Sequence, residues 1–234
     1  MHDVDQARAL IRAAEQGDKD SVVDLISEVP CIDCTDAQGY SALSIAAVRG
    51  HTEICEILLR RGANVDHVMS LGTPLFLAAG NGHALAVDLL IQHGADVCRN
   101  NIRRETALHR DATFGQYGIC MVLIQKGANV NARDDDKGMP IHYAAGNRHL
   151  RVVRLLTESG TDFQEICLGV DTPLHSAVKG GNREIVEFLA SRVRNINSRG
   201  FEGLTALKLA RNLGPHWEEI SEVLTAHGGR DWYA

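Results

Sequence analysis

The sequence predicts an all-α protein, an α-solenoid of about seven repeated helix–turn–helix units. Three observations predict this fold. A short apolar motif recurs every 32 or 33 residues, and glycines recur in a second register. The third is composition, because 44% of the 234 residues are hydrophobic but only 5% are aromatic. Aliphatic side chains must therefore form most of the core.

The first register marks the start of the first helix in each unit. In five of the six copies Thr or Ser stands two residues before a central aliphatic residue, and in some copies Pro lies between them, as in Thr172-Pro173-Leu174. Such a hydroxyl caps a helix, and Pro fits its first turn. A small pair such as Ala46-Ala47 follows and allows the next unit to approach closely. The central residues are Leu43, Leu75, Leu108, Ile141, Leu174 and Leu207.

The second register marks the end of the second helix. In the most regular copy, Gly39–Asp66, the first helix is expected to begin near Ser41 and to end before Gly50. The second helix is expected to stop at Gly62, because a helix commonly ends at a residue in the left-handed conformation, which Gly adopts readily. The corresponding glycines of later copies are Gly94, Gly127 and Gly160.

These motifs resemble the ankyrin repeat family, whose copies of about 33 residues carry a Thr-Pro-Leu-His-x-Ala signature. The resemblance extends from about residue 5 to about residue 227. It implies stacked helix pairs with hairpin loops on one side. It also implies recognition of other molecules by a concave face and hairpin tips, rather than catalysis.

The end units depart from the pattern, as capping repeats must. Residues 1–35 form the expected N-terminal cap, residues 36–203 the internal repeats, and residues 204–234 the C-terminal cap with a loose tail. No linker separates them, so residues 1–234 are expected to form one domain. The cap helices are expected at Gln6–Glu15, Lys19–Glu28, Thr205–Leu213 and Trp217–Thr225.

The hairpin loops vary between copies. Gly39 and Gly203 keep the glycine that the family usually places two residues before the Thr. Other residues replace it at Leu71, Arg104, Lys137 and Val170, and these four hairpins are expected to bend differently or to shift by one residue. The acidic tip Asp134–Asp136 lacks the distal Glu of a calcium loop, so we expect it to be solvated.

Asp111 stands where other copies carry the first Ala of the small pair. A carboxylate near an interface between repeats is costly unless it is paired. Two interpretations stay open. Asp111 is hydrogen-bonded to a partner from the next repeat, or it anchors a ligand or protein in the groove.

The sequence contains no assembled nucleophile, base and orienting group, no phosphate loop and no metal-ligand spacing. We therefore predict no enzyme activity, no cofactor and no metal. The periodic histidines are expected to bridge loops and helices. The six cysteines, including the close pair Cys31 and Cys34, are expected to be reduced and structural.

A net charge of −6 argues against nucleic acid as the partner, and no apolar run could span a bilayer. We predict a cytoplasmic monomer that binds proteins as an adaptor, scaffold or inhibitor; a nuclear location and export as an effector stay open. Alternatives are the recognition part of a larger enzyme complex, an exported effector aimed at host proteins, and a nucleic-acid or small-ligand binder.

The partner-binding hypothesis rests on variable residues of the first helices and hairpin tips. They are Tyr40, Arg49, Met69, Leu71, Asn81, Arg103, Arg104, Asp111, Phe114, Asn147 and Lys179. A separate hypothesis concerns modification. Asn131 and Asn197 lie in hairpins that resemble targets of asparagine hydroxylation.

Overall fold

A computed structural model describes residues 2–68, 72–162 and 171–231. Within these residues the chain forms fourteen α-helices and one 3-10 helix, with isolated β-bridges but no strand, which confirms the all-α prediction. The helices are α1 His2–Gln16, α2 Lys19–Leu25, α3 Ala42–Arg49, α4 Thr52–Arg60, α5 Pro74–Gly80, α6 Ala84–Gln92, α7 Ala107–Phe114, α8 Tyr117–Gln125, α9 Pro140–Gly146, α10 Leu150–Glu158, α11 Pro173–Gly180, α12 Arg183–Ala190, α13 Ala206–Leu213, η1 Pro215–Trp217 and α14 Glu218–Ala226.

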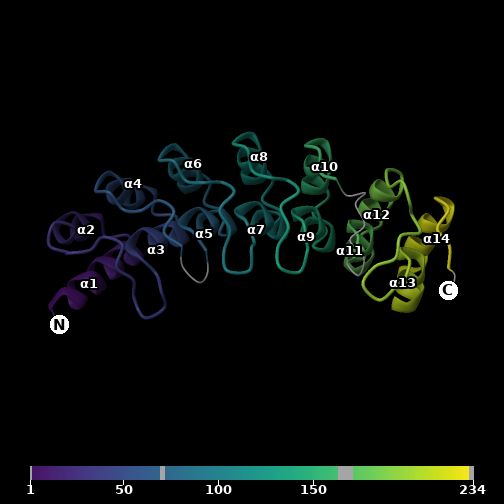
Figure 1. The fold of residues 1–234 in the computed structure, drawn as a ribbon, viewed down its shortest axis with the longest axis horizontal. Helices are drawn as coiled ribbons and strands as arrows, with labels where there is room; N and C mark the ends of the chain where they lie inside the picture. The colour runs from purple at the N-terminus through teal and green to yellow at the C-terminus, as the bar shows by residue number, and fades with distance from the viewer. Residues whose placement is uncertain (1, 69–71, 163–170, 232–234) are drawn as a thin grey trace. The chain divides into compact units, whose positions relative to one another are not determined.

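The chain folds into two compact units. Unit 1 comprises residues 1–111 and 125–128, and unit 2 comprises residues 112–124 and 129–234. Each unit has two layers of helices (Figure 1). In unit 1, α1, α3 and α5 pack side by side, and α2, α4 and α6 form the second layer. In unit 2, α9, α11 and α13 form one layer, and α10, α12 and α14 form the other.

The first helices begin as the motif predicts. The hydroxyls of Ser41, Thr73, Thr172 and Thr205 each accept a hydrogen bond from the backbone N–H three residues later. Each bond satisfies one of the donors that a helix N-terminus leaves without a partner. The second helices of the regular copies end before a glycine with positive φ, as at Gly62 with φ 88°.

The core lies between successive copies. All six central aliphatic residues are at most 3% exposed, and both residues of the Ala46-Ala47 pair are fully buried. Larger side chains at the alanines would overpack this interface at a cost of roughly 1–3 kcal/mol. The repeat register therefore predicts the buried residues correctly.

A column of histidine rings joins neighbouring copies, as predicted. His83 donates from Nε2 to the carbonyl oxygen of Val48 at 2.9 Å, and His149 donates to that of Thr113 at 3.0 Å. Each ring also fills space that a glycine leaves open. A Cβ atom at Gly50 would lie 2.4 Å from Nδ1 of His83, and Gly115 faces His149 in the same way.

The expectation that replaced glycines change the hairpins is wrong at two positions. Arg104 has φ 60° and Lys137 has φ 66°, close to the φ 71° of Gly203. A side chain three residues earlier holds the turn in place. Oδ1 of Asn101 accepts hydrogen bonds from the N–H groups of Arg103 and Glu105 at 2.9 and 3.0 Å. Leu71 and Val170 lie outside the described residues.

Two expectations about the ends need correction. The helix α2 stops at Leu25 rather than at Glu28. The start of the tail is bound rather than loose. Thr205 donates from its hydroxyl to the carbonyl oxygen of Arg230 at 2.8 Å, and Arg211 donates to Asp231 at 2.7 Å.

Candidate functional site

Unit 1 contains a small apolar cluster around its helix α5. Phe76 and Leu77 of α5 are buried, and Tyr40 and Val48 pack against them while staying partly exposed. The guanidinium of Arg110 lies over the ring of Phe76, with Cζ 5.8 Å from the centroid. Arg110 and the buried ring of Phe76 therefore form a cation–π contact within the fold.

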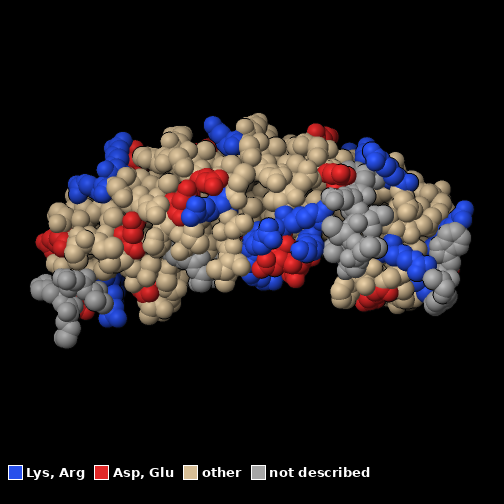
Figure 2. All heavy atoms as spheres, viewed as in Figure 1, with Lys and Arg blue, Asp and Glu red and all other residues tan. Residues whose placement is uncertain are grey.

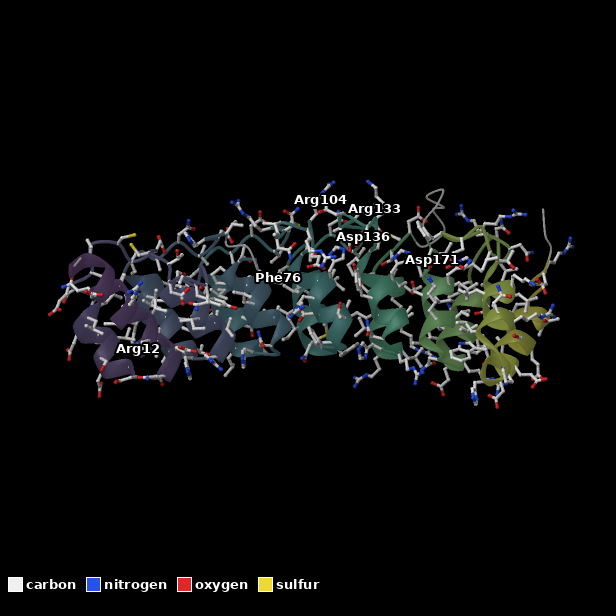
Figure 3. The ribbon with its side chains drawn as sticks, turned by 90° about the horizontal axis from the view of Figure 1, so that it is seen from below. Arg12, Phe76, Arg104, Arg133, Asp136 and Asp171 are labelled. Carbon is white, nitrogen blue, oxygen red and sulfur yellow. The ribbon has the colours of Figure 1, made fainter. Side chains whose placement is uncertain are left out.

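Four other predicted residues of unit 1 are exposed. Arg49 forms an ion pair with Glu15 at 2.7 Å, and Asn81 donates to the carbonyl oxygen of Leu77 at 2.8 Å. The side chains of these two residues are therefore already engaged within the fold. Arg103 and Arg104 are neighbours at a hairpin tip. Figure 3 shows Arg104 on the edge of unit 1 opposite to Arg12 of α1.

Asp111 cannot serve as a surface anchor, because the residue is 0% exposed. The expected partner from the next repeat is also missing. Neither carboxylate oxygen has a hydrogen-bond partner among the described residues. Burial raises the pKa of Asp111 to about 8, so the neutral acid is the favoured form at pH 7.

Unit 2 contains a cavity of about 520 Å³ along its hairpin edge. Figure 3 shows Arg133 and Asp136 on this edge, with Asp171 on the same side of the unit. Hairpins and first helices both contribute to the lining. The described lining residues are Asp135, Asp136, Lys137, Gly138, His142, Tyr143, Asp171, Ser176, Lys179 and Phe201.

The hairpin at residues 134–138 is organised by Asp134, which is buried rather than solvated as expected. Its Oδ1 accepts a hydrogen bond from the N–H of Gly138 at 2.8 Å, and its Oδ2 accepts one from the hydroxyl of Tyr143. The remaining acids of the tip, Asp135 and Asp136, are exposed and line the cavity. The hairpin thus presents carboxylates beside an aromatic ring.

Asp171 connects two further parts of the lining. It forms an ion pair with Lys179 and accepts a hydrogen bond from the N–H of Phe201 at 3.0 Å. Burial alone would raise the pKa of Asp171, but these donors outweigh burial and hold it below its usual value. Asp171 is therefore ionised, and Phe201, with 74% of its surface exposed, stands at the rim.

The histidine in this cavity is a structural group. His142 accepts a hydrogen bond at Nδ1 from the N–H of Met139 and donates from Nε2 to the carbonyl oxygen of Asp171. Burial lowers the pKa of His142 to about 4. The ring is neutral and uses both nitrogens within the fold, which leaves it no proton to exchange with a substrate.

The remaining predicted residues do not gather at one site. Lys179 lines the cavity, whereas Asn147 donates to the carbonyl oxygen of Tyr143 at 2.9 Å. Phe114 of α7 is 48% exposed, and Met69 lies outside the described residues. Sequence reasoning missed Tyr143 and Asp171, because neither recurs in the repeat register.

The two hydroxylation candidates are also joined to the next copy. Oδ1 of Asn131 accepts from the N–H of Asp162 at 2.8 Å, and Oδ1 of Asn197 accepts from the N–H of Arg230 at 2.6 Å. Their hydroxylation stays a prediction. In the described part of the chain, no cluster of three or more His, Cys, Asp or Glu side chains has metal-binding geometry.

Charge is mixed on the surface. Figure 2 shows Lys and Arg side chains interspersed with Asp and Glu on the face it presents. Among the described residues, no helix is both long and apolar enough to cross a bilayer.

Comparison with known families decides the assignment of the fold. A family model for ankyrin repeats in three copies matches residues 10–101, and a second one, for many copies, matches residues 112–157 and 141–190. The chain belongs to the ankyrin repeat family. Ankyrin repeats are a protein–protein interaction module, which agrees with the predicted class of function.

Individual relatives of this ankyrin repeat chain are much longer proteins. It is 30% identical over 67% of its length to the ankyrin repeat and KH domain-containing protein mask-1 of Caenorhabditis elegans. It is 32% identical over 76% of its length to the E3 ubiquitin-protein ligase KEG of Arabidopsis thaliana. The chain spans 6% of the length of the first relative and 11% of the second.

A solved structure agrees with the fold over most of the chain. The crystal structure of the human ASB11 ankyrin repeat domain is similar to it with a TM-score of 0.81 and 25% identity. The match covers 95% of this chain and 99% of that one.

Proposed function

We propose that this ankyrin repeat chain is a non-catalytic adaptor or scaffold that binds a protein segment carrying a basic side chain. The unit 2 cavity is the observation that supports this proposal most. Its rim combines the exposed carboxylates of Asp135 and Asp136 with the rings of Tyr143 and Phe201. A partner's Arg or Lys can contact both, through an ion pair and a cation–π interaction.

The charged side chains of the lining are three carboxylates and two ammonium groups, including the exposed Lys137, so the cavity has a net charge of −1 and favours a cationic partner. Lys179 is already paired with Asp171, so its charge is largely neutralised. The net charge of −6 for the whole chain steers cationic partners towards it. An exposed aromatic residue such as Phe201 is also typical of residues that contribute strongly to binding.

The first experiment tests the cavity. Partners are captured from a native lysate with the wild-type chain and with the variants Asp135→Lys and Phe201→Ala, and the captured proteins are identified by mass spectrometry. We expect each variant to weaken capture about tenfold or more, since changes at hot spots cost about 2 kcal/mol or more. Unchanged capture by both variants would rule out the cavity as the binding site.

The exposed hairpin of unit 1 is a second proposed contact. Replacing both Arg103 and Arg104 by Glu should abolish capture if this tip binds the partner. The matched control is Arg8→Glu with Arg12→Glu on α1, which makes the same change in charge at exposed positions. Equal capture by the two double variants would exclude the hairpin.

The relatives keep one alternative open, that the chain is the recognition part of a larger enzyme. One relative is named as an E3 ubiquitin-protein ligase, and the chain covers 11% of it. An enzyme recovered in equimolar amount in the capture experiment would favour this alternative over an independent adaptor.

A further inference from the structure

The turn that begins each hairpin differs in the first copy. In four later copies whose turns lie within the described residues, an Asn or Asp opens the turn, and its side chain accepts a hydrogen bond from the N–H two residues later. The acceptors are the side-chain oxygens of Asn64, Asp96, Asn129 and Asn195. The donors are the backbone N–H groups of Asp66, Cys98, Asn131 and Asn197, at 3.1, 2.9, 2.9 and 3.0 Å respectively. This side-chain hydrogen bond stabilises the conformation of the turn.

The first copy has Cys31 at the position of that Asn or Asp, so its turn lacks this amide or carboxylate acceptor. Cys34 occupies the fourth position of the same turn. Its N–H still donates to the carbonyl oxygen of Cys31, at 3.4 Å, compared with 3.1 Å for the bond between His67 and Asn64. The two cysteines therefore mark the first and last residues of one hydrogen-bonded turn.

The geometry of such a turn suits a covalent bond between its ends. The Cα atoms of the first and fourth residues of a β-turn are less than about 7 Å apart, and disulfides span roughly 4.4–6.8 Å. Cys31 is exposed and Cys34 is half-buried, so a small-molecule disulfide can reach the first sulfur. The structure shows both cysteines in the reduced form.

We propose that Cys31 and Cys34 form a reversible disulfide, which takes the place of the side-chain hydrogen bond that stabilises this turn in later copies. Oxidised glutathione is a suitable oxidant. The Cys31 thiolate attacks one glutathione sulfur and releases one glutathione thiolate. The Cys34 thiolate then attacks the Cys31 sulfur of the mixed disulfide and releases the second. Two protein thiols are oxidised, and one glutathione disulfide is reduced to two thiols.

The closed turn acts on the junction with the next copy. Asp33 lies between the two cysteines, and its Oδ1 accepts a hydrogen bond from the N–H of Asn64 at 2.9 Å. A covalently closed turn holds Asp33 in the position that makes this bond. Oxidation therefore tightens the contact between the N-terminal capping repeat and the repeat that follows it.

The test uses the full chain in buffers with different ratios of reduced to oxidised glutathione, followed by alkylation and peptide mass mapping. With excess oxidised glutathione, the peptide with both cysteines should resist alkylation and be about 2 Da lighter, through loss of two hydrogens. Hydrogen exchange at the Asn64 amide should slow severalfold, and excess reduced glutathione should reverse both changes.

Two variants separate the proposal from general effects of oxidation. Cys31→Asn restores the residue type of the later copies, so the Asn64 amide should be protected whatever the glutathione ratio. Cys98→Ser removes another exposed thiol and should keep the response. The proposal is overturned if both cysteines stay open to alkylation, if Cys31 keeps a stable glutathione adduct, or if it joins Cys98.

Discussion

The carboxylate of Asp171 supports the following hairpin, because its Oδ1 accepts a hydrogen bond from the N–H of Phe201 at 3.0 Å. Hairpins at Asp36, Asn101 and Asp134 carry their own side chain for this purpose. The equivalent position in the last hairpin is Gly200. A Cβ atom there would lie 2.3 Å from Oδ1 of Asp171, so the earlier repeat supplies the group that this turn lacks.

Replacing Asp171 by Ala should lower the free energy of unfolding by about 1–2 kcal/mol, since a hydrogen bond to a charged group is lost. The Lys179 ion pair adds little, because Lys179 is exposed. Urea titrations at pH 7 and below pH 3.8 measure the effect. The pKa of Asp171 is held below its usual 3.8. The stabilisation is therefore present above pH 3.8 and is lost as pH falls through the folded-state value. An undiminished difference in strong acid would contradict this cause.

Replacing Asp111 by Ala should raise the free energy of unfolding by about 1–3 kcal/mol at pH 8, because the buried carboxyl has no partner among the described residues. Alanine also matches the equivalent residues of the other copies, such as Ala46 and Ala144. Chemical denaturation at pH 5 and pH 8 measures the difference.

The pH dependence of this gain has a defined sign. The pKa of Asp111 is about 8 in the folded chain and near 3.8 when unfolded. Between these values the folded chain keeps the proton and the unfolded chain releases it, so wild-type stability falls as pH rises. The advantage of Asp111→Ala should grow from pH 5 to pH 8. A variant less stable than the wild type by over about 2 kcal/mol would indicate a satisfied network.

Replacing Arg104 by Gly should stabilise the chain by about 1 kcal/mol, because a left-handed backbone costs roughly that amount for residues other than glycine. Thermal and urea unfolding measure the gain. The neighbouring substitution Arg103→Gly is the control, since Arg103 has no positive φ and should gain nothing. Equal effects at the two positions would disprove the role of backbone strain.

Replacing Gly50 by Ala should destabilise the chain by more than about 2 kcal/mol, through backbone strain together with a clash. The new Cβ would lie 2.4 Å from the ring of His83. Gly62→Ala is the matched control, because Gly62 has φ 88° and no atom within 4 Å of the added Cβ. Its cost should stay near 1 kcal/mol. Similar losses in both variants would mean that the His83 contact is unimportant.

The repeat registers predict the helices and the core well, because the same short-range interactions recur in every copy. Ser41 caps α3, Gly62 follows α4, and Leu43 is buried, each as the motif indicates. The positive φ of Arg104 was not predictable from residue type alone. It depends on the hydrogen bonds that Asn101 makes to the turn.

The candidate site was predicted less well than the fold. Asp171 is held by a hydrogen bond from Phe201 and an ion pair with Lys179, and neither repeat register predicts these two contacts. Asp111 was recognised as unusual from the sequence. Its lack of a partner among the described residues depends on packing and could not be foreseen. Lys179 was named from the sequence and does line the cavity of unit 2.

The side chains that join one repeat to the next have a consequence for how such a chain can change length. Asp33 binds the N–H of Asn64, Asp66 binds that of Asp96, and Asn131 binds that of Asp162. Each bond depends only on the adjacent copy and on a separation of 30 or 31 residues along the chain, and the copy that is one residue shorter keeps its bond. Gain or loss of one complete copy leaves this pattern whole. Growth by duplication of whole units is therefore the change that this architecture tolerates best.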